Sequence, residues 1–415
     1  MRIRELSITN YRPFGKTKKL EFKENFSVIA GINGRGKTAI LDAIALLSSR
    51  LLPQIAPAGS GFRKIDISDI HSDALETDLS FKLNCAGIPL DYSLHFYRES
   101  KRIDTTKLTP AVRKEIRNKY GDPSRADDQA PLAVYYTTDR AGYRFPKALP
   151  KAVRIGQSMA YNGALFNRTV DYKDFLARFR VVNTRRQEQN SSMERRAFNA
   201  ISQTIELFLD GFTKLRVEDD PPRLLINKDG ETRDIRQLSD GQRSFIALIC
   251  DLGRRLALAN PELENPLNGA GVVLIDELEL HLHPKWQLEV SEKLRNTFPN
   301  IQFIVTTHSP FIIQTARQGE VITLDGELEI DPYGKSLEEV AKYVMDVENT
   351  EYSPRIKNMR ETARLYLQLA EEAKTASPDR KQQIQRQIIR LLEPFSDNPA
   401  YTALLERKGI IEPEQ

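Results

Sequence analysis

Alternation of apolar and polar side chains over residues 1–30 predicts a β-hairpin that leads into a buried strand. A period of two places every second side chain on one face of a strand. From Ala39 to Leu52 the spacing changes to that of a helix, which Pro53 ends. The apolar positions that set the two periods are Ile3, Leu6, Ile8, Leu20, Phe22, Phe26, Val28 and Ile29, then Ile40, Leu41, Ile44 and Leu47.

The rest of the chain alternates between strand-like and helix-like patterns, which predicts an α/β fold. Alternating segments over 76–105 predict a small antiparallel sheet, and LAVYYTT at 132–138 predicts another strand. Two runs, 271–275 and 301–305, are apolar almost throughout. Such runs are typical of parallel strands that are buried on both faces.

Four regions follow from these patterns. Residues 1–149 and 214–335 carry the sheet patterns and are expected to form two lobes of one head. Residues 150–213 are mostly helical and are interpreted as a helical insertion, and residues 336–415 as a charged, helical C-terminal region. Apolar residues in this last region favour either a lid packed on the head or a partner-docking region, and they are Leu365, Leu367, Leu369, Ile384, Ile388, Ile389, Leu391 and Leu392.

Composition limits the classes of protein that these patterns allow. Of 415 residues, 40% are hydrophobic and 28% are charged, as in globular proteins, and the net charge of +4 does not by itself indicate nucleic acid. The two cysteines, Cys85 and Cys250, lie far apart and are expected to be reduced thiols. No run approaches the ~18 apolar residues that span a bilayer, and the N-terminus lacks the apolar core of a signal peptide. We therefore expect a cytoplasmic protein.

A glycine-rich loop between the first buried strand and the first helix carries the clearest chemistry. Gly31, Gly36, Lys37 and Thr38 fit the pattern G-x-x-x-x-G-K-[ST]. Glycines let backbone N–H groups turn toward phosphate oxygens, and the positive end of the helix dipole points at the same anion. Lys37 is expected to reach the β- and γ-phosphates and Thr38 to bind Mg²⁺.

The apolar run 271–275 ends in two acidic residues, Asp276 and Glu277. Ligands bind at the carboxyl ends of strands in open α/β sheets. Asp276 is therefore predicted to hold Mg²⁺, and Glu277 to polarise the attacking water. Together with the phosphate loop, this acidic pair predicts phosphoryl transfer to water.

Two shorter motifs complete the set. Ser239, in LSDGQ at 238–242, precedes a helix and is either an ordinary helix cap or part of a second phosphate site. His308 follows the strand 301–305 and is either a structural histidine or a partner of the γ-phosphate.

The order of these four elements resembles the nucleotide-binding heads of ABC-type ATPases, over roughly residues 1–60 and 214–315. The long interval between Thr38 and Leu238 is similar to the RecF, SMC and overcoming-lysogeny-defect branch, in which an insertion separates these motifs. The resemblance implies a mixed sheet around the phosphate loop and an antiparallel β subdomain. The helical insertion and the C-terminal helical region complete the implied architecture.

The resemblance also implies cofactors and site residues. ATP with Mg²⁺ is implied to lie between the phosphate loop of one copy and the LSDGQ motif of another. Lys37, Glu277 and His308 are implied as catalytic residues, with Thr38 and Asp276 as Mg²⁺ ligands. The branch has a glutamine that contacts the metal, and the loop Thr138–Arg140, where it is expected, contains none. The implied nucleotide contacts are Arg12, Asn33, Gly34, Arg35, Gly36, Lys37, Thr38, Ala39, Ser239, Gly241 and Gln242.

The sequence around the motifs is similar to that of a group of compact bacterial ATPases, which are called predicted ATP-binding proteins involved in virulence. This group includes PtuA, the ATPase subunits of Septu antiphage systems, which work with a separate HNH nuclease, PtuB. The resemblance implies an ATP-dependent dimer or larger homo-oligomer that controls such a nuclease, possesses no nuclease activity of its own and can contact DNA through the complex. The segments that carry it are GINGRGKTAILDAIALL, LIDELELHLHPKWQ and FIVTTHSPFII.

Other interpretations stay open on the sequence. His281 and His283 have an H-x-H spacing that can bind metal, although no further ligand lies nearby in sequence. The chain could instead be a RecF-like repair ATPase that binds DNA itself, or a scaffold that binds ATP and turns it over slowly. Six arginines in the insertion would serve DNA binding, or form a solvated helix face: Arg178, Arg180, Arg185, Arg186, Arg195 and Arg196.

Overall fold

The computed structural model describes most of the chain. The described residues are 1–56, 58, 62–120, 130–141, 147–150, 156–166, 172–189, 192–219, 221–324, 326, 330–345, 347, 354–395, 397–398, 401 and 405. Contacts divide the chain into two compact units, Met1–Asp346 and Val347–Gln415.

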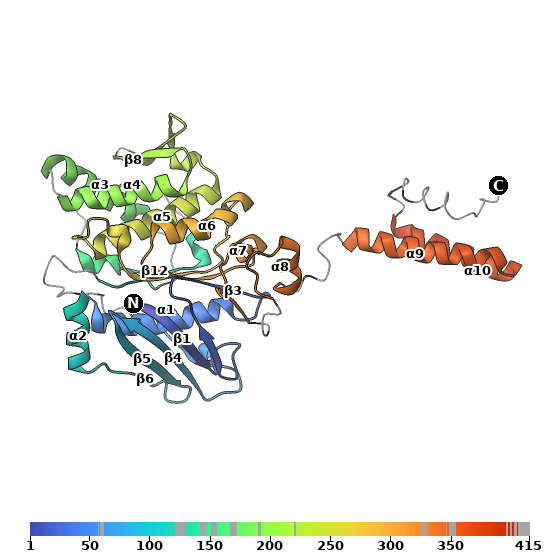
Figure 1. Cartoon of the computed structure of the whole chain (residues 1–415), viewed down its shortest axis with the longest axis horizontal. Helices are drawn as coiled ribbons and strands as arrows, with labels where there is room; N and C mark the ends of the chain where they lie inside the picture. The colour runs from blue at the N-terminus through green and yellow to red at the C-terminus, as the bar shows by residue number, and fades with distance from the viewer. Residues whose placement is uncertain are drawn as a thin grey trace. The chain divides into compact units, whose positions relative to one another are not determined.

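A parallel five-stranded sheet forms the centre of the first unit (Figure 1). Its strands, in spatial order, are β13 (Val321–Thr323), β3 (Phe26–Ala30), β12 (Ile301–Thr306), β11 (Gly271–Ile275) and β7 (Leu132–Tyr136). Every residue of β3, β7, β11 and β12 is buried, as the apolar runs predict for strands covered on both faces. The predicted α/β class is confirmed.

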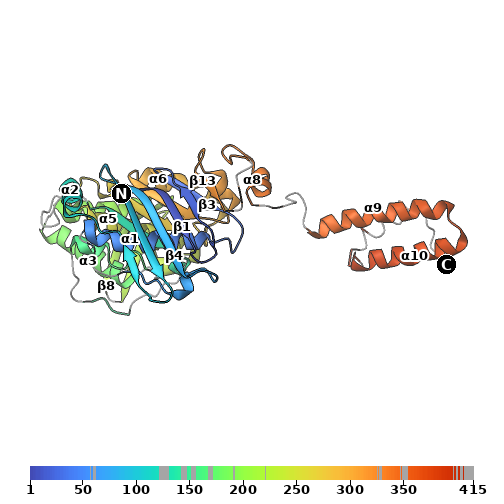
Figure 2. The same cartoon turned by 90° about the horizontal axis from the view of Figure 1, so that it is seen from below.

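An antiparallel sheet lies against the central one, and Figure 2 looks onto its strands. In spatial order these are β2 (Lys18–Glu21), β1 (Arg2–Thr9), β4 (Glu76–Cys85), β5 (Ile88–Tyr97) and β6 (Ile103–Thr105). Gln302 on β12 joins the two sheets, because its side chain bonds both backbone groups of Ile3 at 2.7 Å. In the strand order above, β1 from the predicted N-terminal hairpin is next to β4 from the predicted small antiparallel sheet. Both predicted segments are therefore parts of one sheet.

Helix α1 (Lys37–Ile55) runs between the two sheets and contacts strands of both. A helix covered on all sides must be apolar all round, and this explains its run of alanine, leucine and isoleucine. By length and hydropathy α1 would also fit a membrane span, but 78% of its apolar stretch is buried inside the protein. Burial of this helix fixes the position of the loop that precedes it.

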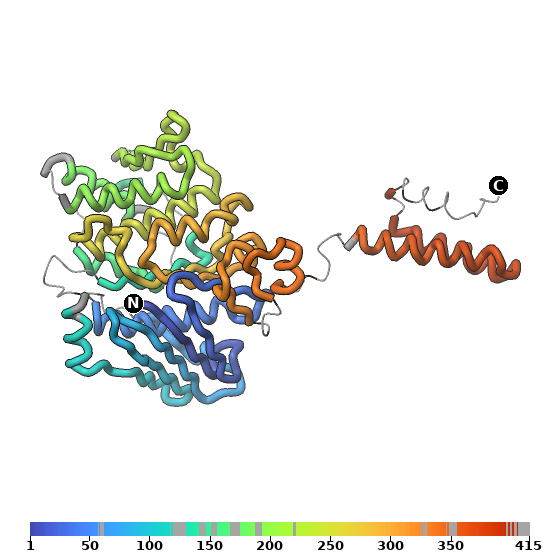
Figure 3. The backbone as a smooth tube through the Cα atoms, viewed as in Figure 1, coloured from blue at the N-terminus to red at the C-terminus, as the bar shows by residue number. Residues whose placement is uncertain are grey.

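Helices cover the other face of the central sheet. Helix α5 (Asp240–Ala259) contacts β7 and lies beside α6 (Pro284–Thr297), and α4 (Ser192–Phe208) and α3 (Tyr172–Gln189) form a further layer that packs on α5. The backbone path in Figure 3 shows the green α3–α4 pair beside the yellow α5. Two further elements of this unit are helix α2 (Pro110–Tyr120) and a small sheet of β8 (Phe212–Asp219), β9 (Pro222–Lys228) and β10 (Glu231–Asp234).

Five of the six arginines on α3 and α4 are engaged within the protein, and the sixth, Arg195, is exposed. Arg178 is only 7% exposed, and the guanidinium of Arg186 lies 3.8 Å from the centre of the Phe198 ring. Others bind backbone carbonyls or acids: Arg180 binds Pro150 at 2.7 Å, Arg196 binds Pro261 at 2.9 Å, and Arg185 faces Glu194 at 3.7 Å. These five side chains therefore contribute contacts within the helical region.

Two short helices end the first unit. Helix α7 (Pro310–Gln314) packs on α8 (Leu337–Tyr343). The boundary between the two compact units lies after α8, at Asp346, whereas the C-terminal region was expected to start at residue 336.

The second unit is an antiparallel pair of helices, α9 (Pro354–Thr375) and α10 (Pro378–Leu392). The prolines at 354 and 378 begin these helices, where a missing backbone N–H costs nothing. A small core holds the pair together and contains Tyr366, Ala370, Ile384, Ile388 and Leu405. In contrast, Leu365, Leu367 and Ile389 remain between 43% and 64% exposed.

Candidate functional site

The phosphate loop occupies the turn between β3 and α1. Gly31, Gly34 and Gly36 all have positive φ angles, of 146°, 82° and 97°. A Cβ on Gly36 would meet the side chains of Pro13 and Phe14 at 2.7 Å, so only glycine fits there. The crest, from Ile32 to Arg35, is exposed, whereas the side chain of Ala39 is buried in the core.

Lys37 lies along the inside of this loop. Its Nζ donates to the carbonyl oxygens of Gly31 at 2.7 Å and Ile32 at 3.0 Å. The residue is only 6% exposed. The Lys37 ammonium therefore lies inside the glycine-rich loop that precedes α1, where its positive charge and the helix N-terminus favour an anion.

A chain of hydrogen bonds joins the phosphate loop to the acidic strand end. The Thr38 hydroxyl donates to an Asp276 carboxylate oxygen at 2.9 Å, and the Thr306 hydroxyl donates to the other at 2.6 Å. Thr306 in turn accepts the backbone N–H of Glu277 at 2.8 Å. The ends of β11 and β12 and the start of α1 therefore meet at one point, where a carboxylate and a hydroxyl oxygen match the ligands that Mg²⁺ prefers.

Glu277 follows Asp276 in a left-handed backbone conformation, with φ of 49°. The backbone carbonyls of Asp276 and Glu277 both accept hydrogen bonds from the guanidinium of Arg140. Burial lowers the pKa of Arg140 to about 10, although the nearby carboxylates of Asp276, Glu279 and Glu277 oppose this lowering. Arg140 is thus charged at neutral pH and lies directly behind the acidic pair.

The resemblance implies a metal-contacting glutamine, for which the loop Thr138–Arg140 is the candidate region although it contains none. The loop holds a buried arginine instead, and its only signal in the sequence is its place after the strand β7. Sequence reasoning also missed Glu279, which accepts hydrogen bonds from the Thr307 hydroxyl at 2.7 Å and from the backbone N–H of His308. Glu279 therefore fixes the backbone that presents His308 beyond β12.

Arg12 lies beside the phosphate loop, in the turn whose Pro13 and Phe14 cover Gly36. It binds Asp69 at 3.0 Å and Asp42 on α1. Its side chain remains 32% exposed. The structure brings Arg12 close to the loop but ties its guanidinium to carboxylates.

The LSDGQ motif forms the start of α5. Ser239 is the N-cap of this helix and forms a capping box with Gln242. A Cβ on Gly241 would lie 2.0 Å from the carbonyl oxygen of His281, so this glycine lets α5 approach the segment after the acidic pair. Within one chain, the described bonds of this motif are local and do not join it to the phosphate loop.

The two histidines of the H-x-H segment have separate backbone roles. His283 caps α6, where its Nδ1 accepts the N–H of Lys285 at 3.2 Å. His281 has a positive φ of 62°. Among the residues that the structure describes, no three or more His, Cys, Asp or Glu side chains gather as a metal site.

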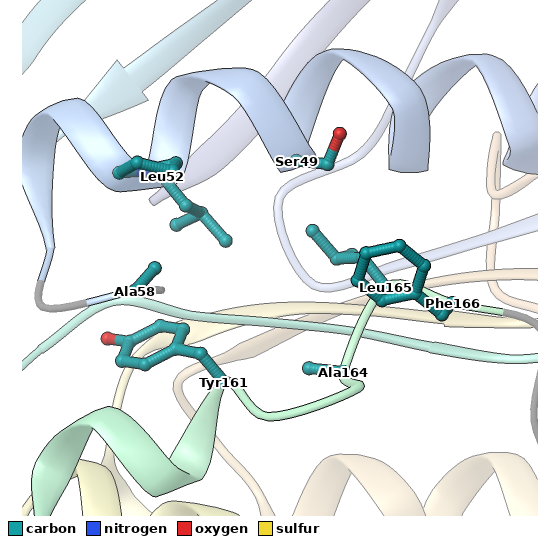
Figure 4. Close-up of a pocket in the computed structure, with 8 residues that line it drawn as sticks. Ser49, Leu52, Ala58, Tyr161, Ala164, Leu165 and Phe166 are labelled. Atoms are coloured by element: carbon teal, nitrogen blue, oxygen red, sulfur yellow. The ribbon is translucent and has the colours of Figure 1, made fainter. Parts of the chain in front are cut away.

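A small cavity lies near the other end of α1, away from the phosphate loop (Figure 4). It is lined by Ser49 and Leu52 on one side and by Tyr161, Ala164 and Leu165 on the other. Its volume is about 30 Å³, which is room for about one water molecule and far too little for a nucleotide. The site at the strand ends is therefore the better candidate for chemistry.

Comparisons with known proteins point to ATPases. Residues 26–314 match a family described as "AAA domain, putative AbiEii toxin, Type IV TA system". The chain is 28% identical over 401 residues to a retron Vc95 probable ATPase of Vibrio cholerae serotype O1 biovar El Tor, covering 81% of this chain and 77% of that protein. It is 26% identical over 348 residues to the Septu protein PtuA of Bacillus thuringiensis, covering 80% and 81%.

A solved structure, the SMC head domain from Thermotoga maritima, aligns with a TM-score of 0.42 and 17% identity, covering 78% of this chain and 94% of that chain. The predicted resemblance to ATPases of the PtuA kind is confirmed by the sequence relatives.

Proposed function

Because the chain belongs to the AAA-domain family that its residues 26–314 match, we propose that it binds ATP with Mg²⁺ and hydrolyses ATP to ADP and phosphate. One observation carries the proposal: Thr38, Asp276 and Thr306 are joined by hydrogen bonds of 2.9 and 2.6 Å. These bonds join the phosphate loop to the acidic strand end at the oxygens proposed to bind Mg²⁺, and this supports the proposal.

The residues divide the work of hydrolysis. The loop N–H groups and Lys37 bind the phosphates, and the Thr38 hydroxyl and Asp276 carboxylate hold Mg²⁺, which neutralises phosphate charge when bound. Glu277 accepts the proton of the attacking water as general base. His308, at the end of the adjacent strand β12, donates a hydrogen bond to the γ-phosphate.

The active site is completed by a second copy of the chain. Ser239 and the N-terminal end of α5 form a second anion-binding surface, because the positive end of a helix dipole favours an anion. The described bonds of the LSDGQ motif do not join it to the phosphate loop of the same chain, and the ATP of a partner copy is its proposed ligand. Nucleotide is thus proposed to lie between two protomers.

Ser239→Arg is expected to abolish ATP-induced dimerisation while nucleotide affinity changes by less than about threefold, because the loop that binds the phosphates is untouched. Light scattering on size-exclusion chromatography, with and without ATP, measures the dimer. Ser336→Arg is the matched control, since Ser336 caps α8 with the same capping box. A dimer that forms equally well in both variants contradicts the sandwich.

The biological role proposed is that of an ATPase subunit in a bacterial antiphage defence complex that controls a separate HNH nuclease. Support comes from the relatives named as Septu and retron ATPases. The exposed residues Leu365, Leu367 and Ile389 of the second unit make α9 and α10 the proposed docking region for that nuclease.

Purification of the tagged chain from its own operon is expected to recover an HNH nuclease in stoichiometric amount, detected by mass spectrometry. Ile389→Glu should release the nuclease without unfolding the chain, because this side chain is 64% exposed. Lys381→Glu on the same helix is the control, at an exposed position that is already charged. Recovery of the chain alone, or with DNA in place of a nuclease, contradicts the proposed role.

A further inference from the structure

Arg140 lies in the loop after β7, next to the backbone of the acidic pair Asp276 and Glu277. β7 and β11 are parallel, with Tyr136 opposite Ile275, so the residues that follow the two strands lie side by side. The N–H of Asp276 donates to the Tyr136 carbonyl at 2.9 Å, which extends the pairing by one step. Arg140 then follows in the short 3₁₀ turn Thr138–Ala141.

The guanidinium of Arg140 binds the backbone on one side of Glu277. Its Nη1 donates to the carbonyls of Asp276 and Thr137, the latter at 3.2 Å, and its Nη2 donates to the carbonyl of Glu277. Arg140 is 3% exposed, so these bonds are shielded from water. A planar guanidinium fork can hold two such carbonyls at once.

The other side of the same backbone is held by β12. The N–H of Glu277 donates to the Thr306 hydroxyl at 2.8 Å, and the N–H of Leu278 donates to the Thr306 carbonyl at 3.0 Å. Both peptide groups that flank Glu277 are therefore fixed from two neighbouring strands, by Arg140 and by Thr306.

This double fixation matters because Glu277 has a φ of 49°. A non-glycine residue in the left-handed region carries a steric cost and returns to extended or right-handed backbone when its contacts are lost. Such a return would swing the Glu277 carboxylate away from its present direction. The carbonyl bonds of Arg140 oppose that change directly.

The loop that carries Arg140 is itself anchored. The Tyr136 hydroxyl donates to Asp251 on α5 at 3.0 Å, and Asp251 is paired with Arg255 at 2.6 Å in the interior. Helix α5 begins at the LSDGQ motif. This hydrogen bond ties β7, the strand that precedes Arg140, to α5, whose first turn is proposed to bind the ATP of a partner copy.

We infer that Arg140 is a positioning residue for ATP hydrolysis, which holds the backbone of Glu277 so that its carboxylate faces the attacking water. The inference rests on the proposed function of Glu277. It assigns Arg140 no contact with the nucleotide, and so separates its effect from that of Lys37. Loss of Arg140 should therefore slow turnover and leave ATP binding intact.

The test compares full-length wild-type protein with Arg140→Lys and Arg140→Gln. Lysine keeps the charge but presents a single nitrogen, which cannot reproduce the fork. Phosphate release should show kcat lowered by about 10- to 100-fold in both variants, since small misplacements of a catalytic group cost rates of this order. The Kd of a fluorescent ATP analogue should change by less than about threefold.

Arg98→Lys is the matched control, because Arg98 also binds two backbone carbonyls, of Ala74 at 2.8 Å and His71 at 2.9 Å, outside the site. It should lower Tm without a selective loss of kcat. An unchanged kcat in Arg140→Lys overturns the inference, as does loss of kcat and affinity in parallel. If neither Arg140 variant folds while Arg98→Lys does, the role of Arg140 is structural and the inference also fails. Wild-type protein that releases no phosphate would sink the proposed function itself, and the role of Arg140 with it.

Discussion

Glu277→Gln is expected to bind ATP normally and to lose between about 10²- and 10⁴-fold in the rate of phosphate release. The range is what a positioned general base contributes. The amide is nearly isosteric, and the backbone bonds of Glu277 to Arg140 and Thr306 do not involve its side chain. The site should therefore keep its geometry and lose only the proton acceptor.

Single-turnover phosphate release and the Kd of a fluorescent ATP analogue measure the two halves of this prediction. The ATP-bound dimer should also persist longer in this variant, because hydrolysis no longer removes the γ-phosphate. Glu292→Gln is the control, since Glu292 lies on α6 and pairs at the surface with Arg295 and Arg317. A Glu277→Gln protein with wild-type turnover would show that another group accepts the proton.

Lys37→Ala is expected to weaken ATP binding by roughly 100-fold or more. Hydrogen bonds to charged groups contribute about 1.5–3 kcal/mol each, and about 1.4 kcal/mol corresponds to a tenfold change in affinity. Lys37 is proposed to reach two phosphates, so both contacts are lost together. Removal of the buried lysine also leaves the carbonyls of Gly31 and Ile32 without their donor.

Isothermal titration with a non-hydrolysable ATP analogue checks the affinity directly. Lys342→Ala, at an exposed position on α8, serves as the control for loss of one positive charge. Thermal unfolding without nucleotide should show that the Lys37 variant is folded. Unaltered affinity in that folded variant would remove the phosphate loop from the proposed site.

The two variants separate binding from chemistry. Lys37→Ala should lower phosphate release through loss of bound substrate, whereas Glu277→Gln should lower it at saturating ATP. Arg140→Lys is expected to behave like a weaker Glu277→Gln. Agreement of this pattern across three positions would support a division of labour that no single variant can establish.

Much of the central fold could be predicted from local patterns. A period of two, unbroken apolar runs and the G-x-x-x-x-G-K-[ST] loop depend only on neighbouring residues, and these features led to β3, the phosphate loop, α1 and β11. The chemical roles proposed for Thr38 and Asp276 also follow from residue type and position at a strand end. In the structure the Thr38 hydroxyl donates to the Asp276 carboxylate at 2.9 Å, and a shared role in binding Mg²⁺ stays a prediction.

Other features depend on contacts between segments that are far apart in the sequence, and no sequence pattern predicted them. Nothing in the sequence distinguished Arg140 from other loop arginines. Its position next to the backbone of Asp276 and Glu277 follows from the parallel pairing of β7 with β11. The arginines of α3 and α4 resembled a basic face, yet packing engages Arg178, Arg180 and Arg186 within the protein.

The sequence by itself therefore determined the phosphate loop, the acidic strand end and the class of fold, because short-range patterns and residue chemistry specify them. Only the tertiary structure decided what holds Glu277 in its left-handed conformation and what the Gly241 position must accommodate. Both depend on contacts between residues far apart in the chain, Arg140 with Glu277 and Gly241 with His281. Such contacts arise from the packing of strands and helices, which local periodicity does not encode.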